Sequence, residues 1–262
     1  MFDSLAVYLL VSLVALLASG LTLFSGFGLG TLLLPAFLLF FPVQPAIAMT
    51  AVVHFLSNLL KLFLLGKKAD RHAVLQFGLP AMLAALFGAW LLLQLGDFAD
   101  LASYTLAGHR HTVTATKLVI ALLMLGFALL EASSRSETLI VKDRRFLAVG
   151  GLLSGFFGGL SGHQGAFRSA FLVASGLSKE AFIATGVIIA CLVDLSRLSL
   201  YATSLQYLER SLWPLIATAT LSAFLGVFIG TRLLPKVTIV WLKKLVAIMF
   251  CLTALLLAGG II

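Results

Sequence analysis

Asp194 and Arg197 are oppositely charged side chains inside an otherwise apolar stretch of this sequence. Their spacing places them on one face of a helix, where a carboxylate and a guanidinium can form a salt bridge. Charges at membrane depth are costly and usually face a cavity or a partner. The pair therefore has two interpretations. It is a self-neutralising structural bridge, or a functional pair in which Arg197 is shared with an anionic substrate or Asp194 takes up a proton.

His54, Asn58 and Lys61 form a second polar group inside an apolar stretch. His54 and Asn58 share a helix face, so His54 is either a hydrogen-bonded packing residue or a ligand contact or proton relay. Lys61 lies close before the lysines at 67 and 68. Its side chain either snorkels to the membrane surface or faces the protein interior.

Two glycine-rich turns, SGFGLGT (25–31) and GGLSGHQG (158–165), each precede a short apolar segment. Glycine permits the sharp backbone geometry of a broken helix, and the N-terminus of the following half-helix is a ready anion site. The alternative is that these glycines only allow close helix packing. The first interpretation predicts a substrate site with these residues in and after the turns: Gly26, Gly28, Gly30, Thr31, Gly162, His163, Gln164, Gly165 and Arg168.

Composition assigns the chain to the membrane. Hydrophobic residues make up 61% and charged residues 11% of 262, whereas soluble domains carry roughly a quarter charged residues. Positions 4–60 contain no charged residue, far more than the roughly 20 apolar residues that span a bilayer. The net charge of +8 comes from basic residues that punctuate apolar runs, which argues against nucleic acid as a partner.

No cofactor or metal site is indicated. Cys191 and Cys251 lie in apolar stretches and are interpreted as packing residues. The turns do not match GxxxxGK[ST], and no metalloprotease or serine-hydrolase motif is present. The sequence therefore does not favour an enzyme.

Charge, proline and glycine positions divide the chain into ten apolar segments. Eight are long enough to cross a membrane, and two, 31–41 and 166–175, are about half that length. The eight longer segments are 4–24, 45–66, 73–95, 112–130, 146–161, 181–201, 212–232 and 241–261.

The two halves of the chain resemble each other. Residues 25–66 align with 158–201, which pairs Thr50 with Thr185, Asn58 with Asp194 and Lys61 with Arg197. This predicts a first membrane repeat at 1–131, a cytoplasmic linker at 132–145 and a second membrane repeat at 146–262.

Basic residues gather on one predicted face of the bundle. That face collects Lys67, Lys68, Arg71, Arg135, Lys142, Arg144, Arg145, Lys179, Arg232, Lys236, Lys243 and Lys244. The other collects Arg110, Lys117 and Arg210. The positive-inside rule makes the first face cytoplasmic and places both termini outside. Five segments per half then give an inverted-topology repeat, a construction typical of secondary transporters.

At its glycine-rich turns the sequence resembles the TauE/SafE family of membrane transporters, the sulfite exporter family. The motifs are SGFGLGTLLLPAFLLF and PAIAMTAVVHFLSN in the first half, and GLLSGFFGGLSGHQG and AFIATGVIIACLVD in the second. The resemblance implies a transporter of small sulfur-containing anions in a bacterial inner membrane. The second turn departs from the family pattern, with Ser169 at the position equivalent to Pro35. We expect His163, Gln164 and Arg168 to adapt the pocket to its anion.

Together these features predict an all-α polytopic protein with about eight transmembrane helices and two short broken or re-entrant helices, in two inverted repeats. The predicted function is secondary transport, as an exporter, of sulfite, an organosulfonate or a related sulfur-containing or carboxylate anion. Transport would proceed by alternating access around a midplane site formed by the two turns with Arg168, Arg197, His54, Asn58 and Asp194. The coupling ion would be a proton or sodium. A passive anion channel and a membrane-embedded enzyme or scaffold are the alternatives.

Overall fold

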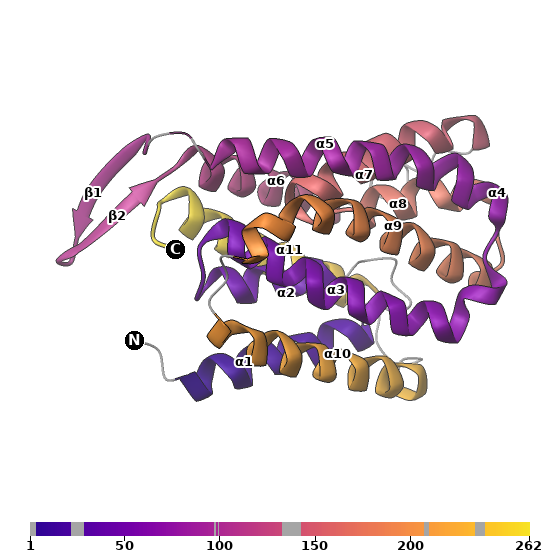
Figure 1. Ribbon diagram of the computed structural model, residues 1–262, viewed down its shortest axis with the longest axis horizontal. Coiled ribbons are helices and arrows are strands. Elements are labelled where there is room, and N and C mark those ends of the chain that lie inside the picture. Colours follow the sequence, from indigo (N-terminus) through magenta and orange to yellow (C-terminus); the bar gives the residue numbers. More distant parts are fainter. Residues whose placement is uncertain are drawn as a thin grey trace.

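The computed structural model describes residues 4–21, 29–96, 98, 100–132, 143–206, 210–233 and 239–262, which form a bundle of helices with one β-hairpin at its end (Figure 1). In the first half the helices are α1 (Ser4–Leu21), α2 (Leu29–Leu38), α3 (Val43–Leu65), α4 (Arg71–Ala73), α5 (Leu79–Leu95) and α6 (Ala115–Ala132). A π-helical turn, Val74–Gly78, joins α4 to α5. In the second half they are α7 (Leu147–Ser161), α8 (Gly165–Leu172), α9 (Lys179–Gln206), α10 (Trp213–Leu233) and α11 (Ile239–Ala258). Single 3-10 turns cover Gly66–Lys68, Arg144–Phe146, Val173–Ser175 and Arg210–Leu212.

The prediction of an all-α polytopic membrane protein is confirmed. Among the described residues, four helical stretches are long and apolar enough to cross a membrane: Val43–Lys68, Arg71–Leu95, Lys179–Ala202 and Trp213–Gly230. The other apolar helices are shorter. Large apolar side chains point outward from the bundle, as Phe63 at 85% exposure and Leu129 at 70% do. A surface of this kind is suited to lipid rather than to water.

α7 and α8 form a hairpin that returns to the end of the bundle at which it began. α7 has 15 residues, so it is roughly 22 Å long at 1.5 Å per residue. Gly162, in the left-handed region with φ of 83°, ends it, and α8 leads back. At that end the guanidinium of Arg144, before α7, donates to the carbonyl oxygen of Ser175, after α8. The short segment at 166–175 therefore runs back along α7, which was counted above as a full span.

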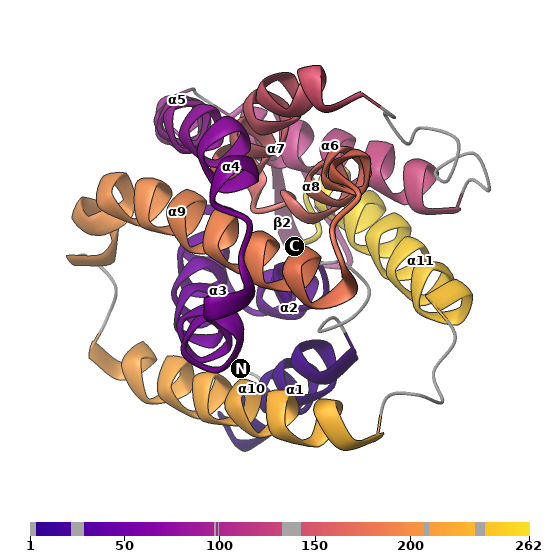
Figure 2. The ribbon, with the colours of Figure 1, turned by 90° about the vertical axis from the view of Figure 1, so that its right-hand side faces the viewer.

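Each of four helices in the first half has a counterpart in the second: α1 corresponds to α7, α3 to α9, α5 to α10 and α6 to α11. The helix contacts are the same when each helix is replaced by its counterpart. α1 packs on α10, and correspondingly α7 packs on α5. α5 contacts α9, and α10 contacts α3. The counterparts α3 and α9 pair with each other, as do α6 and α11. Figure 2 shows α3 and α9 crossing in the middle, between the α1–α10 pair and the α5–α7 pair. This is the arrangement expected of two related halves.

The α5–α7 pair is held by direct contact between backbones. A β-carbon on Gly155 would lie 2.0 Å from the carbonyl oxygen of Ala81, and one on Gly159 would lie 2.1 Å from that of Ala85. Side chains at these positions would force the helices apart. Glycine at these two positions therefore serves close packing, as in other membrane helix pairs.

One β-hairpin lies outside the apolar segments and was not predicted. β1 (Ala102–Leu106) pairs antiparallel with β2 (His109–Val113) around Ala107 and Gly108, both with positive φ. Positive φ at both central residues is typical of a type I′ turn, which fits the twist of the strands. The Tyr104 hydroxyl donates to the carbonyl oxygen of Gly259, so the hairpin packs on the end of α11.

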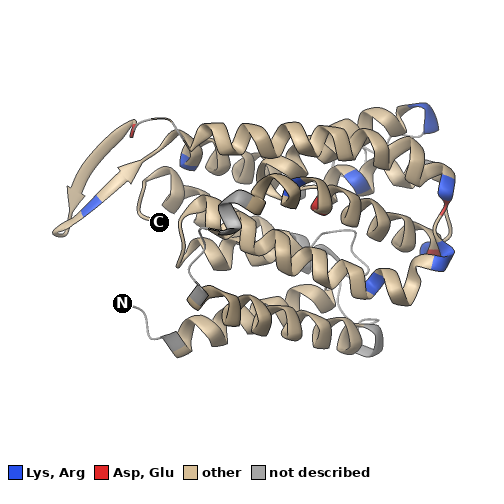
Figure 3. Cartoon of the chain, in the orientation of Figure 1, with Lys and Arg blue, Asp and Glu red and all other residues tan. Residues whose placement is uncertain are grey.

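The two ends of the bundle differ in charge. Most of the coloured basic residues lie at the end opposite the hairpin (Figure 3). At that end the backbone N–H of Asp70 donates to the Thr185 hydroxyl at 2.9 Å, which ties the α3–α4 connection to α9. We call this the basic end. The start of α1 and the end of α11 lie at the other end (Figure 1). Of the predicted basic face, Arg135, Lys142 and Lys236 lie outside the described residues.

Candidate functional site

Polar side chains meet at the centre of the bundle, where α3, α9 and the α7–α8 turn come together. Each is buried, and we call them the buried polar cluster: His54, Asn58 and Lys61 from α3, Gln164 and Arg168 from the turn and α8, and Asp194 and Arg197 from α9. Their helices are apolar elsewhere. Burying this many polar groups is costly unless each is paired, so their contacts decide what the cluster can do.

Asp194 is the hub of the cluster and is completely buried. One carboxylate oxygen, Oδ2, lies 2.6 Å from Nδ1 of His54. The other, Oδ1, accepts from Nε and Nη2 of Arg197 at 3.0 and 2.8 Å, and from Nε2 of Gln164 at 3.3 Å. Both oxygens are therefore occupied by groups of the protein.

Arg197 is bound to the protein along its whole guanidinium. Besides the two bonds to Asp194, its Nη1 donates to the carbonyl oxygen of Gly158 at 3.4 Å. Of the two interpretations offered by the sequence, the self-neutralising salt bridge is the geometry observed. Arg197 thus joins α9 to the end of α7.

His54 and Asn58 lie together on α3, as their spacing predicted. Nδ2 of Asn58 lies 3.1 Å from Nδ1 of His54 and 3.3 Å from its Nε2. His54 is therefore held between Asn58 and Asp194. The contact joins the first half of the chain to the second.

The described end of the first glycine-rich turn, at Gly30, meets the second turn beside His54. A β-carbon on Gly30 would lie 3.7 Å from the carbonyl oxygen of Gly162 and 3.9 Å from Cδ2 of His54. Thr31 is buried next to Gly30 in α2, and Gly165 is the first residue of α8. Gly26 and Gly28 lie outside the described residues.

Gln164 connects the turn to the rest of the cluster. Its Nε2 donates to Asp194, and its Oε1 accepts from Nη1 of Arg168 at 3.3 Å. Its backbone carbonyl accepts from the Ser154 hydroxyl at 2.8 Å, which fixes the turn against α7. Gln164 is therefore a bridge between the salt bridge and Arg168.

Arg168 and Lys61 carry the charges that the salt bridge does not use. Arg168 lies against Gly186 of α9, where a β-carbon would approach its Nε to 3.4 Å. Lys61 is only 5% exposed, so it does not snorkel to the surface. The two cations lie within electrostatic range of each other and of the Cys191 thiol, and Arg168 also of Asp194. No carboxylate of the described residues pairs with either cation.

His163 lies on a different side of the turn. Its ring stacks on Phe127 of α6 at a centroid distance of 5.1 Å and meets Phe250 of α11 edge-on at 4.8 Å. Its Nδ1 lies 2.9 Å from the Ser161 hydroxyl, which itself donates to the carbonyl oxygen of Phe157. The sequence predicts His163 in one site with Gln164 and Arg168, whereas in the structure His163 contacts Ser161 and this aromatic group.

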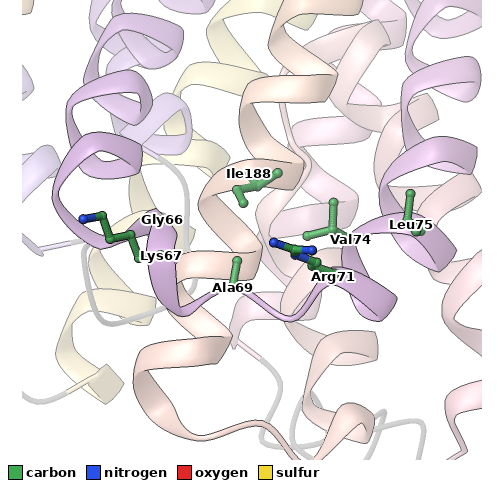
Figure 4. A pocket seen from close by; sticks show the side chains of 7 residues that line it. All are labelled: Gly66, Lys67, Ala69, Arg71, Val74, Leu75 and Ile188. Atoms are coloured by element: carbon green, nitrogen blue, oxygen red, sulfur yellow. The ribbon is translucent and has the colours of Figure 1, made fainter.

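A pocket of about 360 Å³ opens at the basic end (Figure 4). It is lined by Gly66, Lys67, Ala69, Arg71, Val74, Leu75 and Ile188. Ile188 lies on α9 one turn before Cys191, and Lys67 lies in the 3-10 turn that follows α3. The pocket therefore lies between α9 and the connection that leaves α3.

Three residues of the site region were not predicted. Ser154 and Tyr201 fix the backbone of α7 and its turn; the Tyr201 hydroxyl donates to the carbonyl oxygen of Gly159 at 2.5 Å. Cys191, interpreted as a packing residue, lies beside the two unpaired cations. Only Tyr201 had a signal in the sequence, because it follows Arg197 by one helical turn.

The described residues hold no group of three or more His, Cys, Asp or Glu side chains that could bind a metal ion. The cluster is instead rich in hydrogen-bond donors and positive charge. Such a donor set is suited to an anion with several oxygens.

Comparison with known proteins identifies one family. A family model described as sulfite exporter TauE/SafE matches residues 11–257, from α1 to α11. A search of the curated proteins finds no match. The match covers both halves of the chain and the whole buried polar cluster.

Proposed function

The chain belongs to the sulfite exporter TauE/SafE family, and on this premise we propose that it carries a small anion across the membrane by alternating access around the buried polar cluster. The anion would be sulfite, an organosulfonate or a related sulfur-containing or carboxylate anion. We infer a transporter rather than an enzyme, located in a bacterial inner membrane with the basic end in the cytoplasm, as the positive-inside rule favours.

The observation that carries this proposal is the excess of positive charge in the cluster. Lys61, Arg168 and Arg197 are buried with a single carboxylate, that of Asp194. No other acidic residue of the sequence lies well inside an apolar segment, including the stretches outside the described residues. Unpaired buried charge is costly, and a bound anion would offset it.

Arg168 and Lys61 are the groups proposed to hold the anion. Arg197 is held by Asp194, whereas Arg168 has a hydrogen bond to the neutral Gln164. Arginine offers a planar fork that matches the geometry of an oxyanion. The N-terminus of α8, one turn before Arg168, adds the positive end of a helix dipole.

Access from the basic end would run through the pocket beside Arg71. From there α3 and α9 lead past Lys61 and Cys191 to Asp194. Opening the opposite side would complete the cycle, as in other transporters with repeated halves. Net export against a gradient requires coupling to protons, to sodium or to the membrane potential, which is worth about 2.3 kcal/mol per charge per 100 mV. The contact between His54 and Asp194 is the proposed proton-binding group if the coupling ion is a proton.

Flux into proteoliposomes tests the proposal. We expect saturable uptake of sulfite by the wild-type protein, and an initial rate at least tenfold lower for Arg168→Gln. Arg145→Gln is the matched control, because the side chain of Arg145 is 90% exposed, and it should transport normally. Conductance that does not saturate would indicate a channel instead. Normal flux in Arg168→Gln would refute the proposed site.

A further inference from the structure

Among the described residues, no carboxylate forms an ion pair with Lys61, the buried cation of α3, and its counterpart in the other half of the chain shows the difference. Arg197, its repeat equivalent, has Asp194 three residues earlier on α9 and binds it at 2.8 Å. At the same position before Lys61 stands Asn58, which is neutral. The second half of the chain therefore neutralises its own cation, and the first half does not.

The charge of the cluster follows from this difference. Three cations and one carboxylate leave an excess of two positive charges, on Lys61 and Arg168. Both side chains are more than nine-tenths buried; Arg168 lies against Gly186 of α9, and α9 packs on the helix that carries Lys61, so each raises the cost of burying the other. A monovalent anion would offset only one of them. An anion with two negative charges would offset both.

We propose that Lys61 sets the valence of the anion, so that the site prefers divalent oxyanions to monovalent ones of the same shape. The inference rests on the proposed function and deepens it. Arg168 supplies the fork that binds either kind of anion. Lys61 supplies the second charge, which only a divalent anion can use fully.

Sulfate and methanesulfonate are suitable probes, because both have a tetrahedral sulfur and differ by one charge; a methyl group in methanesulfonate replaces one of the four oxygens of sulfate. Their affinities for the full-length protein in nanodiscs can be compared by calorimetry in chloride-free buffer of low ionic strength. We expect the wild-type protein to bind sulfate at least tenfold more tightly, since one added unit charge in a partly desolvated site has at least this effect.

Two variants remove the unpaired charge in different ways. Lys61→Met deletes the cation, and Asn58→Asp gives it the carboxylate that its counterpart has. Either should bring the ratio of the two affinities at least fivefold closer to one, because it weakens the binding of sulfate more than that of methanesulfonate. Lys68→Met is the control, because Lys68 is exposed and outside the pocket lining, and its ratio should stay at the wild-type value. If Lys61→Met does not fold, Asn58→Asp and Lys61→Gln provide the same comparison.

The outcomes separate this inference from the proposed function. If the wild-type protein binds neither probe, both are overturned. If it binds the two probes equally, the valence inference is wrong and the anion site remains. If it prefers sulfate and the variants with altered charge keep that preference, Lys61 does not set the valence.

Discussion

Replacing Asp194 by asparagine should destabilise the protein by about 3–5 kcal/mol, the usual cost of removing one partner of a buried ion pair. The substitution keeps the shape of the side chain, so it opens no cavity. It removes only the negative charge and one of two acceptor oxygens. The guanidinium of Arg197, which is 1% exposed at its side chain, is then buried without a counter-charge.

The individual contacts give a similar magnitude. Asp194 accepts two bonds from Arg197 and lies 2.6 Å from the ring of His54. A hydrogen bond to a charged group contributes about 1.5–3 kcal/mol, against about 0.5–1.5 kcal/mol for a neutral one. Losing the charge in these contacts therefore costs about 1 kcal/mol for each, and about 3 kcal/mol in total.

A double-mutant cycle measures the pair directly. The free energy of unfolding would be measured in mixed micelles by titration with denaturing detergent, followed by circular dichroism. We expect Asp194→Asn and Arg197→Gln to be destabilising singly. In the double variant neither residue of the pair is charged. Its loss of unfolding free energy should therefore be smaller than the sum of the losses of the two single variants, by about 2 kcal/mol or more.

Two results would refute this reasoning. One is a stability of Asp194→Asn within about 1 kcal/mol of the wild type. The other is additivity of the two substitutions within about 0.5 kcal/mol, the agreement found for residues that do not interact.

Three further predictions concern the fold and its orientation. Gly155→Val should prevent α5–α7 packing, because a β-carbon there meets a carbonyl oxygen at 2.0 Å. Size-exclusion chromatography should then show aggregated protein. The control Gly126→Ala, with no atom within 4 Å of the new carbon, should fold normally. Tyr201→Phe should lower the free energy of unfolding by about 1–3 kcal/mol, because it leaves a buried backbone carbonyl of α7 without its donor; an unchanged detergent-unfolding curve would contradict the bond. In a cysteine-free background, a cysteine at Lys68 should react with an impermeant thiol reagent only from the cytoplasm and one at Ser103 only from outside; the reverse labelling would overturn the proposed topology.

The ten helical segments could be predicted because the membrane imposes a simple requirement on the sequence. A helix in lipid needs a long uncharged run, and the breaks between runs are marked by glycine, proline or charge. The bounds of α7 were predicted closely, 146–161 against Leu147–Ser161, but its pairing with α8 as a hairpin was not. Its residues remain apolar up to the turn, and only the left-handed backbone at Gly162 decides that the chain reverses there. The β-hairpin was missed because its strands are five residues each and lie in a polar connection with no apolar run.

The candidate site was predictable in its residue types but not in its pairing. Scarcity of charge in the apolar segments was enough to single out Lys61, Arg168, Asp194 and Arg197. The repeat also indicated that Asn58 and Asp194 are equivalent. Which cation the single carboxylate neutralises depends on side-chain direction and distance between helices, and the sequence carries neither.

The sequence by itself determined that this chain is a polytopic membrane protein, because lipid excludes charge and a charged residue inside an apolar segment is easily recognised; it also predicted two related halves. The tertiary structure decided which group each of these buried charged residues contacts. Packing of α3 against α9 brings His54 to Asp194, the α7–α8 turn inserts Gln164 between that carboxylate and Arg168, and Arg197 is bound within its own helix. Lys61 and Arg168 are left as the unneutralised charges, because electrostatic pairing is decided at distances of a few ångströms that only the folded chain fixes.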